Sequence, residues 1–204
     1  MEYVIVIIIS YLIGTISPAM ITARRVKKID IRDVNSKNAG TSNIAMTLGM
    51  KYAVIVGLSD ILKGAIPVAI LRLVFPDNEI IWIVGGLSAV VGHIYPVFYG
   101  FRGGKGTATF GGMILAVFPL QAIVLAVFFY IVLIVSDFIT TATIAVMIAI
   151  PIMMIIQGNE NISIILVSIF SLFSIFLHRK NVMRIIRKEE IGLRKGISER
   201  HDVR

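Results

Sequence analysis

Cysteine is absent from this sequence, and charged residues are scarce. Without cysteine, the chain has no disulfide bond, no thiolate metal ligand and no cysteine nucleophile. Charged residues make up 16% of the chain and hydrophobic residues 57%, whereas an ordinary soluble domain is about one quarter charged. This balance excludes an ordinary soluble domain and predicts a polytopic membrane protein.

Six apolar runs approach or exceed the roughly 20 helical residues that cross a bilayer. No repeat, low-complexity tract or soluble domain separates them. We therefore expect an all-α fold in which residues 1–204 form a single membrane domain. The runs are Val4–Ala23, Tyr52–Phe75, Ile80–Tyr99, Thr109–Val135, Phe138–Gln157 and Ile162–Leu177.

The basic residues gather in three segments. Of 20 Lys and Arg, seven lie in 24–51, two in 102–105 and nine in 179–204. Basic loops mark the cytoplasmic face, so we expect the N-terminus outside and the C-terminus in the cytoplasm. Topology then explains the net charge of +8, and no nucleic-acid partner is expected. The N-terminal run lacks a basic start and a cleavage site, and predicts a first spanning helix instead of a signal peptide.

The number of helices follows from parity. If segments 102–105 and 179–204 share one side, the chain crosses an even number of times between residues 109 and 177. Three apolar runs lie there. Either Thr109–Val135 is broken at Pro119 into two short spans, which gives seven transmembrane helices, or one run is not a full crossing, which gives five. Both numbers stay open.

The first polar segment, DIRDVNSKNAGTSNIAMTLG at 30–49, groups small hydroxyl and amide side chains around Gly40. Such side chains can surround a ligand with hydrogen-bond donors while the glycine backbone approaches closely. The segment is equally typical of a polar loop before a helix capped by Ser42 or Asn43.

The second segment, GHIYPVFYGFRGGKGTATFGG at 92–112, holds consecutive glycines and Lys105 before a helical stretch. Glycine N–H groups, a lysine and a helix N-terminus together suit a phosphate. The spacing is not that of a Walker A loop, because Gly106 follows Lys105. Glycines with a cation also serve packing and topology at membrane helix ends, and His93 by itself is typical of a structural histidine.

The third segment, FLHRKNVMRIIRKEE at 176–190, places His178 and Asn181 three residues apart, on one helical face. Its basic residues are also typical of a helix that touches anionic lipid. Within the second apolar run, Asp60 and Lys63 are charged at membrane depth, where charges face protein or water. Their spacing permits an ion pair, with a structural role or a role in the site.

Together these segments resemble the bacterial acyl-phosphate–glycerol-3-phosphate acyltransferases (PlsY). The similarity covers nearly the whole chain in order and spacing. The matching motifs are Asp30-Ile31-Arg32, Ser36-Lys37-Asn38-Ala39-Gly40-Thr41-Ser42-Asn43, Asp60-Ile61-Leu62-Lys63-Gly64, Gly92-His93-Ile94-Tyr95-Pro96, Gly103-Gly104-Lys105-Gly106 and His178-Arg179-Lys180-Asn181-Val182.

The resemblance implies an enzyme of the bacterial inner membrane with a cytoplasmic active site. It would transfer a fatty acyl group from acyl phosphate to the 1-hydroxyl of glycerol 3-phosphate, giving lysophosphatidic acid and phosphate. Partners are these two substrates and membrane lipid; no cofactor or metal is expected, and the sequence sets no oligomeric state. Expected catalytic residues are Ser36, Lys105, His178 and Asn181, and expected phosphate-binding residues are Asn38, Gly40, Asn43, Gly103, Gly104, Gly106, Thr107 and His93.

The sequence departs from the family pattern at a few positions. Lys37 replaces the first glycine of the serine motif, and Met46 stands where the family usually has an arginine. A lost phosphate-binding arginine removes a charge-assisted contact of about 1.5–3 kcal/mol. A catalytically weakened paralogue therefore remains an alternative, and a transporter of a phosphorylated solute is another.

Overall fold

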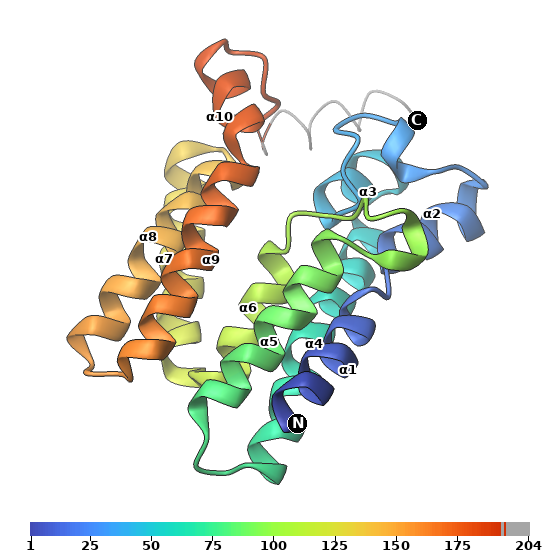
Figure 1. The fold of residues 1–204 in the computed structure, drawn as a ribbon. Helices are drawn as coiled ribbons and strands as arrows, with labels where there is room; N and C mark the ends of the chain where they lie inside the picture. The colour runs from blue at the N-terminus through green and yellow to red at the C-terminus, as the bar shows by residue number, and fades with distance from the viewer. Residues whose placement is uncertain (193, 195–204) are drawn as a thin grey trace. The chain divides into compact units, whose positions relative to one another are not determined.

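The computed structural model describes residues 1–192 and 194. The described residues are helical, with no strand among them, and they divide into two compact units, Met1–Pro119 and Leu120–Arg204. Figure 1 shows the helices of each unit. The last part of the basic C-terminal segment, residues 193 and 195–204, lies outside the described residues.

The first unit contains the helices α1, α2, α4, α5 and α6, the short helix α3, and two 3-10 helices. In chain order, with the 3-10 helices labelled η, these helices are α1 Glu2–Gly14, α2 Pro18–Lys27, η1 Ile31–Asp33, α3 Thr41–Leu48, α4 Met50–Val74, α5 Glu79–Ile94, η2 Val97–Tyr99 and α6 Thr107–Val117. The second unit is built from α7 Pro119–Ser136, α8 Ile139–Ile156, α9 Asn161–Leu177 and α10 Arg179–Ile186.

Glycines bring the long helices of the first unit into close contact. A Cβ atom at Gly14 of α1 would lie 2.0 Å from the Ala89 carbonyl oxygen of α5, and one at Gly92 would lie 2.2 Å from that of Tyr11. The α4–α6 pair repeats this arrangement, with Gly64 against the Thr109 carbonyl. Small residues of this kind let membrane helices pack backbone to backbone.

Local sequence explains where the apolar runs break. The first run stops at Gly14 and restarts at Pro18, where the Ser17 side chain caps α2 by accepting from the Met20 N–H at 3.4 Å. Phe118 leaves the helical conformation (φ −130°) directly before Pro119, as the residue before a proline usually does. The run Thr109–Val135 is thus broken at Pro119, as in the first of the two alternatives left open by the sequence, and the break separates α6 from α7.

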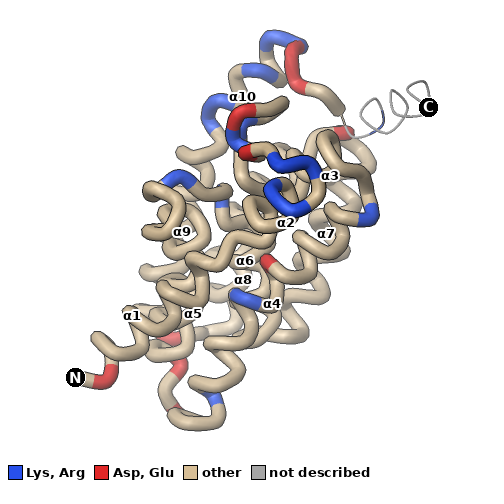
Figure 2. The backbone as a smooth tube through the Cα atoms, turned by 90° about the vertical axis from the view of Figure 1, so that its right-hand side faces the viewer, with Lys and Arg blue, Asp and Glu red and all other residues tan. Residues whose placement is uncertain are grey.

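Within the described residues, five helices are long and apolar enough to cross a membrane, or six if the bent pair α9 and α10 is one span. The shorter apolar helix Thr107–Val117 is additional. The all-α membrane architecture is thus confirmed. In the first unit, Figure 2 shows Lys and Arg gathered around α2 and α3.

Candidate active site

The first polar segment is a loop held together by Asn43. This side chain is fully buried (0% exposed), and its Nδ2 donates to the carbonyls of Ile31 at 2.7 Å, Val34 at 3.1 Å and Asn38 at 3.0 Å. The expected cap at Ser42 or Asn43 is wrong, because α3 begins at Thr41 with Gly40 as its N-cap. The Asn43 amide therefore fixes the shape of the loop.

The other predicted residues of this loop are more open. Ser36 and Asn38 are half-buried, and Gly40 lies in an extended conformation (φ −139°) before α3. Lys37 between them adopts a left-handed conformation with φ 54°. Met46, at the position of the missing arginine, is 36% exposed on α3.

The glycine-rich segment packs directly on the end of α5. The N–H groups of Gly103 and Gly104 donate to the carbonyls of Ile94 at 3.0 Å and His93 at 3.2 Å. A Cβ atom at Gly104 would lie 2.1 Å from Nε2 of His93 and 2.9 Å from the Ala39 carbonyl oxygen. These two glycines therefore allow close packing, and their N–H groups bind carbonyls of the chain.

The following residues lead into α6. Gly106 has φ 82°, a left-handed conformation that glycine adopts without strain, and it is the N-cap of α6 without a side-chain cap. Thr107 is the first helical residue, and Lys105 is half-buried just before it. The helix N-terminus thus keeps backbone N–H donors that no capping side chain occupies.

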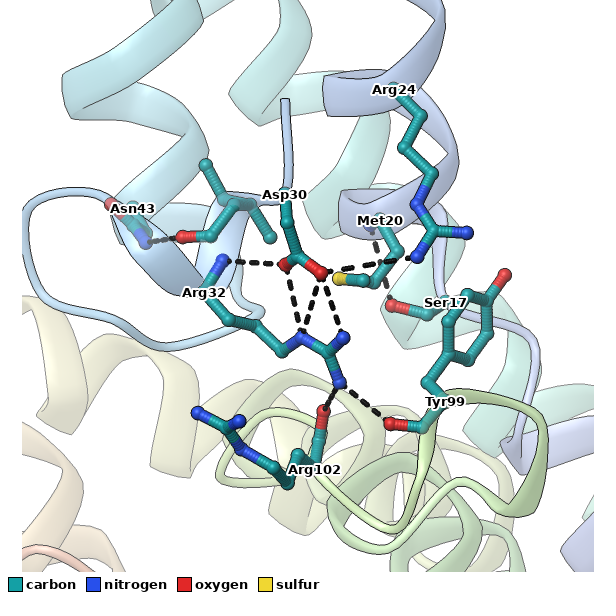
Figure 3. A network of polar contacts seen from close by, with 9 residues as sticks. Ser17, Met20, Arg24, Asp30, Arg32, Asn43, Tyr99 and Arg102 are labelled. Atoms are coloured by element: carbon teal, nitrogen blue, oxygen red, sulfur yellow. Dashed lines mark hydrogen bonds and ion pairs between the residues drawn. The ribbon is translucent and has the colours of Figure 1, made fainter. Parts of the chain in front are cut away.

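Arg32 joins the first loop to the second (Figure 3). Its Nη1 donates to the carbonyls of Tyr99 at 2.6 Å and Arg102 at 3.1 Å, while Nε and Nη2 bind the Asp30 carboxylate at 2.9 Å and 2.7 Å. Arg24 stacks over the Tyr99 ring at 5.6 Å. With the Ala39–Gly104 contact, the structure brings the two predicted segments together within the first unit.

The hydrogen bonds from Arg32 hold the pKa of Asp30 below its ordinary value of 3.8, although burial opposes this. A depressed carboxyl pKa adds stability that is complete above the ordinary value and is lost as pH falls through the folded-state value. We expect Asp30→Asn to lower the thermal midpoint at pH 6, and the difference from wild type to shrink below pH about 3.8. Thermal unfolding in detergent across this range measures it; a difference that does not change with pH would contradict it.

Asp60, Lys63 and His93 form a buried polar cluster that reaches the glycine-rich segment at Gly104. Lys63 Nζ lies 2.9 Å from Oδ1 of Asp60, and Nδ1 of His93 lies 3.3 Å from the same oxygen. Lys63 also donates to the Ile16 carbonyl at 2.7 Å, in the break between α1 and α2. His93, predicted to bind phosphate, thus lies between Asp60 and the backbone of Gly104.

The second unit positions His178 and Asn181 at a bend. The chain turns by 47° between α9 and α10, and His178 lies at the turn. Nδ1 of His178 is 2.8 Å from the Ser174 carbonyl oxygen; since a carbonyl only accepts, Nδ1 is the donor of this hydrogen bond, and Nε2 is the acceptor when the ring is neutral. Asn181 Nδ2 donates to Glu190 at 2.6 Å, and Arg184 Nε binds the same carboxylate at 2.5 Å.

Two further residues, Arg32 and Glu190, hold the site together and are not among the site residues expected from the sequence. The only sequence signal for Arg32 is its place in the motif Asp30-Ile31-Arg32. Glu190 follows Asn181 by nine residues, a spacing that no helical periodicity connects. Among the described residues, no group of His, Asp and Glu is arranged to hold a metal ion.

Comparisons with known proteins agree over most of the chain. The family model "Glycerol-3-phosphate acyltransferase" matches residues 4–188. Curated glycerol-3-phosphate acyltransferases from Bacillus cytotoxicus and Bacillus subtilis are 37% and 36% identical; each match spans 91% of this chain, and 92% and 95% of the relative.

Solved structures agree as well. The crystal structure of PlsY, an integral membrane glycerol 3-phosphate acyltransferase, in its glycerol 3-phosphate form has a TM-score of 0.88 and 32% identity, over 94% of this chain and 96% of that one. The lysophosphatidic acid form of PlsY has a TM-score of 0.86 and 30% identity, over 97% and 99%.

Proposed function

We propose that this chain, which belongs to the glycerol-3-phosphate acyltransferase family, transfers a fatty acyl group from acyl phosphate to the 1-hydroxyl of glycerol 3-phosphate. The products are lysophosphatidic acid and inorganic phosphate. The reaction takes place at the cytoplasmic face of the bacterial inner membrane, with the N-terminus outside. Residues 1–204 act as one membrane-embedded acyltransferase domain.

The observation that carries this proposal is the junction of two polar loops in the first unit. Arg32 bonds to the carbonyls of Tyr99 and Arg102, and Ala39 lies against Gly104. The serine-containing loop and the glycine-lysine segment therefore share one end of the unit, where basic residues gather (Figure 2). Two phosphate-bearing substrates require such a concentration of donors and positive charge.

Lys105 and the N-terminus of α6 suit a substrate phosphate. Lys105 provides a charge, and the backbone N–H groups that begin at Thr107 have no capping side chain. A helix N-terminus favours anions through these donors and through its dipole. Ser36 and Asn38 in the first loop add hydroxyl and amide donors. The N–H groups of Gly103 and Gly104 are bound to carbonyls, so these glycines support the site by packing.

The reaction needs positioning more than a strong nucleophile. The 1-hydroxyl oxygen attacks the acyl carbonyl carbon, the bond from that carbon to the phosphate oxygen breaks, and phosphate leaves. Nε2 of His178, the acceptor when the ring is neutral and Nδ1 donates to Ser174, takes the hydroxyl proton, or a substrate phosphate takes it. Asn181 donates to the developing oxyanion, a contact of a kind that is worth about 3 kcal/mol in other enzymes.

Acyl transfer by the purified protein tests the function. Labelled glycerol 3-phosphate is incubated with acyl phosphate, or with an acyl thioester as the alternative donor, and lysophosphatidic acid is measured. We expect product with acyl phosphate alone. Lys105→Ala and His178→Ala should each lower kcat/KM by about a hundredfold, while Lys51→Ala, an exposed lysine at the start of α4, should not.

Two outcomes would reject the proposal: no product from wild type, or full rates from both site variants. Met46→Arg in the same assay tests the weakened-paralogue alternative. If wild type is slow and Met46→Arg restores the rate, the chain is a weakened member of the family; comparable rates show that Met46 is compatible with the reaction.

A further inference from the structure

The glycine-rich segment has little regular structure of its own. Between η2 and α6, residues 100–106 form a turn and an irregular stretch, and the turn holds Gly100 and Phe101 at φ 64° and 57°. Two sets of hydrogen bonds fix the backbone just before Lys105. Gly103 and Gly104 bond to the end of α5, and the carbonyls of Tyr99 and Arg102 bond to Arg32.

We propose that Asp30 and Arg32 are a positioning pair for acyl transfer: they set the place of the glycine-lysine segment relative to the serine-containing loop. That Arg32 holds the two loops together is argued from the contacts drawn in Figure 3. That this affects catalysis rests on the proposed function. Neither residue touches substrate in this assignment. Both act through the backbone that carries Lys105 and through the loop that carries Ser36.

The arrangement around Arg32 requires a guanidinium. Nε and Nη2 donate to the two carboxylate oxygens of Asp30, and Nη1 donates to the two carbonyls of the other loop. Asp30 also accepts from the Arg32 backbone N–H at 2.9 Å, which fixes the start of η1. A planar fork of donors can bridge three partners in fixed directions, whereas an ammonium is a flexible point charge.

The pair is close in sequence to the site residues that it positions. Arg32 lies four residues before Ser36, and Arg102 lies three residues before Lys105. A change in this bridge therefore moves both loops relative to each other at short range. Misplacement of a binding group by about 1 Å can cost up to a hundredfold in rate. The Arg32 side chain is only 15% exposed, so solvent does little to weaken the bridge.

Kinetics with conservative variants separate positioning from folding. Arg32→Lys keeps the charge but not the fork, and Asp30→Asn keeps an oxygen for the backbone of Arg32. We expect each to raise the KM for glycerol 3-phosphate about five- to tenfold, with the larger effect for Arg32→Lys. Asp33→Asn, an exposed carboxylate in the same 3-10 helix, should leave KM unchanged. A variant that only folds less well would lower kcat at unchanged KM.

A distance measurement that needs no activity completes the test. Because the chain has no cysteine, a variant with the two substitutions Arg25→Cys and Phe98→Cys can be spin-labelled at these two positions alone. Both are exposed residues of the first unit. Their distance distribution by pulsed electron resonance should be narrow in the parent and in Asp33→Asn, and broader or displaced in Arg32→Lys.

The outcomes are distinct. A raised KM together with a changed distance distribution supports the positioning pair. An unchanged KM in both Arg32→Lys and Asp30→Asn, or a loss of kcat alone with an unchanged distribution, overturns it. If wild type makes no lysophosphatidic acid, the proposed function fails, and the distance distribution still decides whether Arg32 sets the loop position.

Discussion

Alanine at Gly112 is expected to force α4 and α6 apart and to lower the free energy of unfolding by about 3 kcal/mol or more, at the upper end of overpacking effects. The new Cβ atom would lie 1.9 Å from the Ile61 carbonyl oxygen, a backbone atom of α4 that cannot move aside alone. The facing contact at Gly64, whose Cβ would lie 2.0 Å from the Thr109 carbonyl oxygen, holds the same crossing. A shift of the helix therefore breaks both contacts.

The neighbouring glycine provides a matched control. A Cβ atom at Gly111 would meet nothing within 4 Å, so Gly111→Ala should be neutral or slightly stabilising, by at most about 1 kcal/mol. Thermal unfolding in detergent, followed by the fluorescence of the single tryptophan, Trp82, compares the two. Equal midpoints for Gly111→Ala and Gly112→Ala would show that the α4–α6 contact is not as close as the structure has it.

Much of the fold could be predicted because the bilayer makes apolar length informative. The run Tyr52–Phe75 corresponds to α4 Met50–Val74, and Phe138–Gln157 corresponds to α8 Ile139–Ile156. The break at Pro119 was one of two alternatives left open by the sequence, and proline geometry explains it. The break at Ser17 was not expected, because the apolar pattern continues through it and only a local cap marks the restart of α2.

The site was harder to predict than the fold, because side chains and backbone change roles on folding. Asn43 and the amides of Gly103 and Gly104 have the chemistry of phosphate ligands, but the structure engages them with carbonyls of the chain. Which donors are used internally depends on how two loops meet, and that is not a local property. The Arg32 bridge depends on the carbonyls of Tyr99 and Arg102, which lie 67 and 70 residues further along the chain. Every residue has a backbone carbonyl, so no sequence pattern marks the two that Arg32 binds.

For the cluster of Asp60, Lys63 and His93, the sequence allowed one contact to be foreseen and left the others unpredicted. The spacing of Asp60 and Lys63 permitted an ion pair, and the structure shows it at 2.9 Å. The sequence could not indicate that His93 contacts the same carboxylate, nor that the helix break at Ile16 presents a carbonyl to Lys63. The cluster thus joins α4 to α5 and to the break between α1 and α2.

Removing the cation of this cluster is expected to be strongly destabilising. Lys63→Met fills a similar volume but leaves the Asp60 carboxylate, only 2% exposed, with His93 as its remaining partner among the contacts of the cluster. The Ile16 carbonyl loses its donor as well. Breaking a buried ion pair on one side typically costs about 3–5 kcal/mol, because an uncompensated charge remains.

The double variant Asp60→Asn/Lys63→Met separates the cost of an unpaired charge from the cost of lost packing. It removes both charges, and replacing a buried pair by neutral groups is often close to neutral in stability. We therefore expect the double variant to unfold at a higher temperature than Lys63→Met, although it carries one more substitution. Lys51→Met, on the exposed start of the same helix, should match wild type. If the double variant is instead less stable than Lys63→Met, then the Asp60 carboxylate stabilises the protein without help from Lys63, and His93 is its partner in doing so.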